Sequence, residues 1–213
     1  MTTDTPPGPP LRGRVEKREA ILRAAQRVFG AKGYAATTMD DIAEAAEVAT
    51  PTIYNHMGNK EQLFRYAIGA ANERLNARTL EALAAFPADP EDLREALLEL
   101  AANLTRCMLD PDAWAIRRLI YAEIGRFPDL FADTVNRPGR DASLDALAGR
   151  MAQLAHAGRL RMDDPARAGS HFIALIWADL DAESALGTRP VPPDAVRRTE
   201  RTGVDAFLRA YAP

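Results

Sequence analysis

Apolar residues recur at three- and four-residue spacing along most of the chain, and strand-like alternation rich in Val, Ile or Thr persists nowhere. Alanine, leucine, arginine and glutamate dominate, and all four are good helix formers. The pattern therefore predicts an all-α fold. We expect helices over 14–32, 39–46, 51–57, 60–85, 91–109, 112–125, 128–157, 165–186 and 193–211.

Asp-Pro pairs predict several of the helix starts. Asp can act as the N-cap, and proline at the first helical position loses no hydrogen bond, because that N–H has no partner within the helix. Such pairs occur at 89–90, 110–111 and 164–165. Glycine favours the left-handed conformation that ends helices, and on this basis helix ends are predicted at Gly33, Gly158 and Gly187.

The N-terminal part predicts a helix-turn-helix unit. Residues 1–13 are rich in proline and are expected to form a disordered arm. The segment 14–32 is an amphipathic helix, and two short helices follow it, 39–46 and 51–57, joined by a tight turn. That arrangement is typical of a helix-turn-helix. We therefore divide the chain into the arm, a DNA-binding domain over 14–60 and a second domain over 61–213.

The third helix of this unit, 51–57, has polar chemistry that suits DNA. It is too short to be a stable core element, and its side chains can donate to phosphates or read base edges. We expect Thr50 to be its N-cap and Pro51 its first residue, and we expect Asn59 to cap the helix that follows. The candidate contact residues are Thr50, Thr52, Tyr54, Asn55 and His56.

The net charge of −3 hides an uneven distribution. The segment Arg12–Lys32 holds seven basic and two acidic residues, whereas residues 71–213 hold 18 basic and 22 acidic residues. An acidic second domain disfavours indiscriminate coating of DNA, and a basic first helix favours binding at one end of the chain.

Several other classes of protein are disfavoured. The single cysteine, Cys107, forms neither an intrachain disulfide nor a cysteine-rich metal site, and the three histidines form no close pair. The sequence has no nucleophile, phosphate-loop or metalloprotease motif, so neither an enzyme nor a cofactor is expected. The apolar run 172–178 is too short to span a bilayer, and the first ten residues resemble no signal peptide. We expect a cytoplasmic protein with no membrane partner.

The order and spacing of many residues make the resemblance to a known family specific. The run from 20 to 64 reads AILRAAQRVFGAKGYAATTMDDIAEAAEVATPTIYNHMGNKEQLF, and it resembles the DNA-binding domain of TetR/AcrR repressors. The resemblance implies that Thr50, Pro51, Thr52, Tyr54, Asn55 and His56 face the major groove or its phosphates. It also implies that Thr38 and Lys60 anchor the DNA backbone on either side.

Three positions depart from the family pattern. Glu47 stands where a turn glycine is usual, Ala49 where serine is usual and Met57 where an aromatic residue is usual. Met57 is expected to pack well, because thioether side chains adapt to irregular gaps. Glu47 either disfavours a nearby phosphate or alters the turn, and Ala49 removes one potential phosphate contact.

The second domain is similar to AefR-like C-terminal domains in the runs AIRRLIYAEIGRFPDLFADT and GRLRMDDPARAGSHF. This resemblance implies a helical bundle that dimerises and encloses an effector pocket. Trp114, Arg117, Arg118 and Tyr121 follow one another at helical spacing and mix apolar surface with polar groups. Each aromatic residue can equally be ordinary core. The candidate effector-binding residues are Met108, Trp114, Arg118, Tyr121, Phe127, Phe131, His171, Phe172 and Trp177.

Dimerisation is expected through helices near 141–157 and 165–186, whose apolar and small residues recur at helical spacing. These residues are Leu144, Leu147, Met151 and Leu154 in the first helix, and Ala168, Phe172, Leu175, Ala178 and Ala182 in the second.

Together these features predict a homodimeric repressor that binds an inverted repeat in double-stranded DNA. A small hydrophobic or aromatic effector would release it by changing the separation of the two recognition helices through the helix 60–85. The alternatives are a ligand-blind repressor or an activator of the same fold, and a helical interaction module that does not bind DNA.

Overall fold

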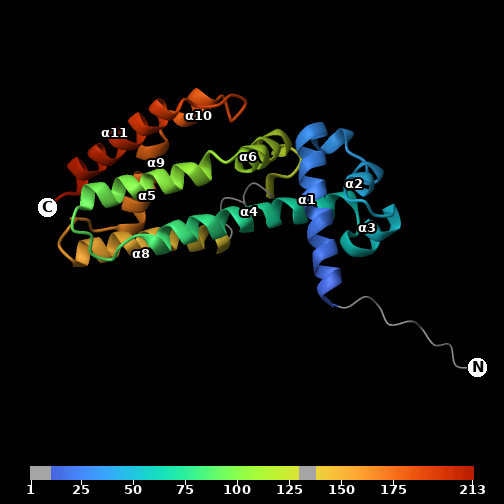
Figure 1. Ribbon diagram of the computed structural model, residues 1–213, viewed down its shortest axis with the longest axis horizontal. Helices are drawn as coiled ribbons and strands as arrows, with labels where there is room; N and C mark the ends of the chain where they lie inside the picture. The colour runs from blue at the N-terminus through green and yellow to red at the C-terminus, as the bar shows by residue number, and fades with distance from the viewer. Residues whose placement is uncertain (1–10, 130–137) are drawn as a thin grey trace, which may run out of the picture. The chain divides into compact units, whose positions relative to one another are not determined.

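The computed structural model describes residues 11–129 and 138–213, and all regular structure in these two ranges is helical (Figure 1). The all-α prediction is confirmed. The chain divides into two compact units, Met1–Ala70 and Ala71–Pro213, which we call the head and the body. Helix α4 contributes its first eleven residues to the head and the rest to the body.

The head comprises α1 (Leu11–Ala36), α2 (Met39–Ala45), α3 (Thr50–Met57) and the start of α4 (Lys60–Ala85). The predicted domain boundary at residue 60 lies ten residues before the boundary in the structure. The reason is aromatic packing, because the Phe64 ring on α4 meets Phe29 and Tyr34 of α1 at centroid distances of 5.0 Å each. Helix α1 begins at Leu11, so the helix includes the last residues of the predicted arm.

Most predicted boundaries of the head hold. Gly33 leaves helical geometry at φ 76°, where the end of the first helix was expected. Thr38 caps α2 in a capping box with Asp41, and Asn59 Oδ1 accepts from Gln62 N at 2.9 Å. The prediction that Thr50 is an N-cap is wrong: Ala49 occupies that position, and Thr50 is the first helical residue.

The body adds α5 (Leu93–Met108), α6 (Pro111–Glu123), α8 (Pro138–His156), α9 (Pro165–Trp177), α10 (Leu180–Ser184) and α11 (Pro193–Tyr211). Asp110 and Asp164 cap α6 and α9 as predicted. The start predicted at Asp89 is wrong, because Asp92 caps α5 through Glu95 N. The helix predicted over 165–186 is broken between α9 and α10. Of the helix predicted over 128–157, residues 130–137 lie outside the described residues.

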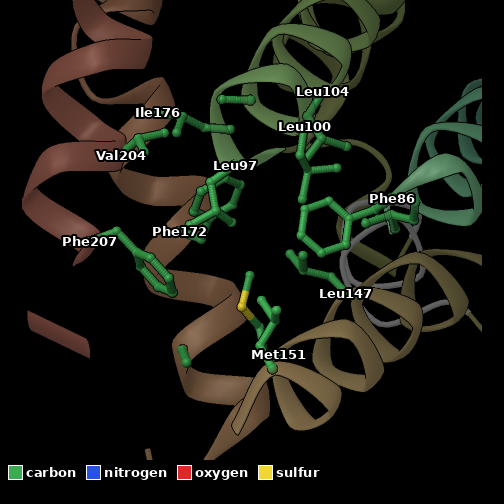
Figure 2. Packing of buried hydrophobic residues seen from close by; sticks show 14 of the residues in the cluster. Phe86, Leu97, Leu100, Leu104, Leu147, Met151, Phe172, Ile176, Val204 and Phe207 are labelled. Atoms are coloured by element: carbon green, nitrogen blue, oxygen red, sulfur yellow. The ribbon is translucent and has the colours of Figure 1, made fainter. Parts of the chain in front are cut away.

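The core of the body lies between α5, α8, α9 and α11 (Figure 2). In this core the rings of Phe172 and Phe207 meet edge to face at 5.2 Å. Helices α9 and α11 approach closely at Gly203, where an added Cβ would lie 2.5 Å from the Leu175 carbonyl oxygen. No larger side chain fits there without moving backbone, so Gly203 permits this packing.

The residues of the core show that part of the expected dimer interface is wrong. Several of the side chains assigned to it are buried within the subunit itself and are not available to a partner. These residues are Leu147, Met151, Leu154, Ala168 and Phe172. Their spacing reflects packing of α8 and α9 within one chain.

Among the described residues, no helix is both long enough and apolar enough to cross a membrane. The described residues also contain no cluster of three or more His, Cys, Asp or Glu side chains arranged to hold a metal ion.

Candidate nucleic-acid interface and effector site

Helix α3 has one buried face and one exposed face. Ile53 and Met57, four residues apart, are buried and hold the helix against the head. Met57 therefore packs as expected of a thioether in an aromatic position. Tyr54 is 51% exposed on the other side, with Pro51 and Asn55 also exposed. Thr52 and His56 are half-buried at the edges, so the sequence-predicted residues lie together on and around one free surface.

The turn between α2 and α3 keeps a glycine-like conformation without glycine. Glu47 adopts φ 54°, in the left-handed region. Its N–H donates to the Glu44 carbonyl at 3.1 Å, and Val48 N donates to the Ala43 carbonyl at 3.0 Å. A non-glycine residue costs about 1–2 kcal/mol in this conformation. The departure at Glu47 thus leaves the turn intact and adds an exposed carboxylate beside it.

Two polar contacts fasten α2 to its neighbours. The Thr50 hydroxyl donates to Asp40 Oδ1 at 2.7 Å, which links the first residue of α3 to the first turn of α2. Arg27 of α1 donates to the carbonyl of Ala45 at 3.2 Å, at the C-terminal end of α2. The helix-turn-helix is therefore positioned from both ends of α2.

Thr38 and Lys60 lie at one corner of the head. Lys60 Nζ donates to the Ala35 carbonyl at 3.2 Å and lies 4.6 Å from the centroid of the Tyr34 ring. Thr38, three residues after Ala35, is exposed at the N-terminus of α2. The N-terminus of α2 is capped by Thr38 and Asp41, so in this structure Lys60 is the positive group beside that helix start.

In the body, two tryptophans and an arginine form a packed cluster. The Trp114 and Trp177 rings lie 5.6 Å apart, and the Arg117 guanidinium lies 4.5 Å from Trp114 and 5.0 Å from Trp177. Arg117 also donates to the Met108 carbonyl at 3.1 Å. We call Met108, Trp114, Arg117 and Trp177 the tryptophan cluster. Met108 joins the cluster through this carbonyl, and Trp114 is only 3% exposed.

The loop after α10 closes the cluster. Gly187 adopts φ 73° so close to Trp114 that an added Cβ would lie 2.1 Å from its Cγ. Arg118 donates to the carbonyls of Leu186 and Gly187 at 3.0 and 3.2 Å and holds this loop against α6. Gly187 was expected only as a helix end, and its packing role has no signal in the sequence.

The other candidate effector residues differ in burial and in the part of the body that they occupy. Tyr121 is 48% exposed, and Phe127 is buried near the end of α6. His171 is exposed, and its Nδ1 lies 2.6 Å from the Tyr211 hydroxyl. Phe172 belongs to the core of the body, and Phe131 lies outside the described residues.

Both parts of the chain match known family models. Residues 21–67 match the bacterial regulatory proteins of the tetR family, and residues 95–213 match the C-terminal domain of AefR-like transcriptional repressors. The chain belongs to the TetR family. The resemblance predicted from the sequence is confirmed, and membership makes the chain a DNA-binding transcriptional regulator rather than an enzyme.

Relatives of this TetR-family chain match it over most of its length. The transcriptional regulator TcmR of Streptomyces glaucescens is 31% identical over 182 residues, which cover 83% of this chain and 75% of TcmR. The structure of the flavonoid-responsive regulator FrrA is similar at 31% identity and a TM-score of 0.72, covering 93% of this chain and 98% of FrrA. A TetR-family regulator from Mesorhizobium loti reaches a TM-score of 0.83 at 26% identity, covering 94% and 98%.

In this TetR-family head, Asp41 makes the stability of α2 depend on pH. A hydrogen bond from Lys32 at 2.7 Å, together with those from Thr38, lowers the pKa of Asp41 from 3.8 to about 2. The stabilisation that ionised Asp41 gives to the folded state is therefore complete above about pH 4, and it is lost as the pH falls through 2. We expect Asp41→Asn to be less stable than the wild type at pH 6, with the gap closing near pH 2. Urea unfolding at both pH values measures this, and an equal gap at both contradicts it.

The N-terminus of α3 lacks a side-chain cap, so a serine is expected to stabilise it. Ala49 is the N-cap, with φ −72° and ψ 140°, and it makes no capping hydrogen bond. Pro51 has no N–H, so a serine hydroxyl in this conformation would share the N–H of Thr52, which donates to the Ala49 carbonyl at 2.8 Å. We expect Ala49→Ser to raise the free energy of unfolding by about 1 kcal/mol, measured by urea unfolding. A matched Ala31→Ser change inside α1 is expected to give no gain, and equal effects would contradict the capping explanation.

Proposed function

We propose that this chain is a homodimeric transcriptional repressor that binds an inverted-repeat operator through α3 and leaves it when a small aromatic effector binds the body. The observation that carries the DNA part is the division of α3 into a buried face, Ile53 and Met57, and a free face around Tyr54. The proposed DNA-contacting residues are Thr38, Thr50, Pro51, Thr52, Tyr54, Asn55, His56 and Lys60. The Thr50 hydroxyl donates to Asp40, so the proposed DNA contact of Thr50 is made by the other exposed atoms of this residue.

A second copy is required because one chain presents one short recognition helix. Specific binding of this type uses two half-sites one or more helical turns apart. Small residues on the outer face of α9, Ala166, Ser170 and Ala174, are exposed and permit close approach of a helix. We therefore propose that α9 contributes to the dimer through this face. A cytoplasmic location follows from the proposed function, since bacterial DNA lies in the cytoplasm.

The proposed effector site is the tryptophan cluster. Trp177 and Arg117 are half-buried, and beside the buried Trp114 they give an indole and a guanidinium on which an aromatic ring stacks well. FrrA is named as flavonoid-responsive, and its similarity to this chain supports an aromatic effector here as well. Of the residues predicted from the sequence, Met108, Trp114 and Trp177 belong to this site, and Arg118 supports it through the loop after α10.

Helix α4 offers a route for release, because it contributes residues to both units. Arg78 on its body segment pairs with Asp110 at 2.6 Å, and Asp110 is the N-cap of α6, which carries Trp114 and Arg117. Arg150 of α8 donates to the Leu83 carbonyl at 3.0 Å, near the C-terminal end of α4. A ligand that rearranges α6 would therefore act on α4. A tenfold loss of DNA affinity requires the effector to favour the released form by about 1.4 kcal/mol.

A combined binding experiment tests this proposal. The full chain is titrated with the flavonoid naringenin. Tryptophan fluorescence measures binding of the compound, and a gel-shift assay measures binding of the chain to its own upstream DNA. We expect saturable quenching and a loss of DNA affinity of at least about tenfold at saturation. Saturable quenching with unchanged DNA affinity would contradict effector release and favour a ligand-blind regulator.

A further inference from the structure

A buried acid lies inside the body, on a helix face that is otherwise apolar or small. Glu200 of α11 is 7% exposed and shares this face with Gly203, Val204 and Phe207. Its Oε1 accepts a short hydrogen bond from the hydroxyl of Thr105 on α5, which is 1% exposed. Among the residues that the structure describes, no lysine, arginine or histidine forms an ion pair with Glu200.

This pair leaves hydrogen-bonding capacity unused. A carboxylate has about four acceptor positions, and the hydrogen bond from Thr105 fills one of them. The Thr105 hydroxyl also lies 3.3 Å from the Ala102 carbonyl, so it is shared between two acceptors. Glu200 is not among the fully buried side-chain atoms that lack a hydrogen-bond partner, so the part of its carboxyl group that Thr105 does not bond remains accessible. The accessible acceptor positions can take hydrogen bonds from water or from a ligand that displaces it.

The pair lies at the same end of the body as the tryptophan cluster. On α5, Thr105 comes three residues before Met108, so the two share a helix face, and the Met108 carbonyl receives the hydrogen bond from Arg117. On α11, Gly203 comes three residues after Glu200 and packs against Leu175 and Ile176, which directly precede Trp177. Both partners of the pair are thus one helical turn from residues that contact or adjoin the cluster.

We infer that Glu200, positioned by Thr105, is the polar determinant of the effector site, and that it selects aromatic compounds bearing a hydrogen-bond donor. The donor is a hydroxyl or an ammonium group that binds the Glu200 carboxyl group while the ring lies against the indoles. An effector with a carboxylate in this place is rejected, because two like charges would meet in an apolar interior. This inference rests on the proposed effector site and adds the class of its ligand.

Intrinsic fluorescence of the full chain tests the inference directly. The chain has two tryptophans, Trp114 and Trp177, and both belong to the cluster. Four biphenyl probes that differ only at position 4 are titrated: hydroxyl, aminomethyl, methyl and carboxylate. We expect at least one donor probe to bind about tenfold more tightly than the methyl probe, and the carboxylate probe to bind most weakly. Equal binding of all four, preference for the carboxylate, or no binding overturns the inference.

Two substitutions separate the two donor chemistries. Glu200→Leu removes the acceptor and is expected to abolish the preference for donors. Glu200→Gln keeps an acceptor without charge, so it should abolish a preference for the ammonium probe and retain much of one for the hydroxyl probe. Glu99→Gln, at an exposed position of α5, is the matched control and should change nothing. An unchanged preference in Glu200→Leu overturns the inference, and the wild-type comparison decides alone if that variant does not fold.

A gel-shift assay of the same protein separates this inference from the proposed function. If the chain binds DNA and the probes release it from DNA, but donor probes are not preferred, only the role of Glu200 would be overturned. A donor preference that disappears in Glu200→Leu, without any effect of the probes on DNA affinity, would support that role and contradict effector release.

Discussion

Replacing Tyr54 by alanine is expected to lower the affinity for the operator about 100-fold or more while leaving the dimer and the fold intact. Tyr54 is the most exposed aromatic side chain of α3, between the buried residues Ile53 and Met57. Losing one good contact to a base or phosphate costs about 1–3 kcal/mol in each half-site, and a dimer loses it twice. Gel-shift titration at one fixed salt concentration measures the loss.

The head provides a matched control for this substitution. Tyr66 of α4 is 46% exposed, close to the value for Tyr54, and its ring lies 5.2 Å from the Arg18 guanidinium carbon. Tyr66→Ala removes the same side chain from a helix that is not expected to enter the groove. We expect it to weaken DNA binding by less than about threefold, the effect of an ordinary surface change of 0.5 kcal/mol or so. Equal losses for the two variants would contradict the assignment of α3 as the recognition helix.

Replacing Gly203 by alanine is expected to destabilise the body by about 2 kcal/mol. The new methyl group would lie 2.5 Å from the Leu175 carbonyl oxygen and 2.9 Å from Ile176 N, both backbone atoms of α9. Forced repacking of this kind costs about 1–3 kcal/mol. The greater helix propensity of alanine offsets part of that cost. Urea unfolding of the full chain, followed by circular dichroism, measures the difference.

Replacing Gly149 by alanine is expected to have the opposite effect on stability. Gly149 lies inside α8, is exposed, and an added Cβ would meet no atom within 4 Å. Gly149→Ala should therefore stabilise the chain by roughly 0.5–1 kcal/mol through helix propensity alone. If both variants are stabilised, the close contact between α9 and α11 at Gly203 is not tight in solution.

Features that depend on local sequence were predictable. Capping by Asn59, Asp110 and Asp164 follows from the residue and its position, and the structure confirms each of these caps. The apolar and alanine-rich pattern of 165–186 continues smoothly, which hid the break after Trp177. The chain then leaves α10 through positive φ at Ala185, Leu186 and Gly187, two of which are non-glycine residues that no turn rule selects.

The two functional surfaces differ in how far the sequence reveals them. The free face of α3 follows from the alternation of apolar and polar residues within eight positions, so its candidates were identifiable. The tryptophan cluster joins α5, α6, α9 and the loop after α10, and the contact of Arg117 with both indoles depends on tertiary packing. The sequence also singles out Glu200, because it is one acid on an otherwise apolar face of α11. The predicted candidates did not include it.

The central claim is that two copies of α3 read an inverted repeat, and footprinting tests it most directly. The full chain is bound to the DNA upstream of its own gene and probed with DNase I. We expect protection of an inverted repeat whose half-site centres lie about 10 bp, or a multiple of this, apart, and loss of that protection in Tyr54→Ala. Uniform protection of any DNA, or a footprint unchanged in Tyr54→Ala, would contradict it.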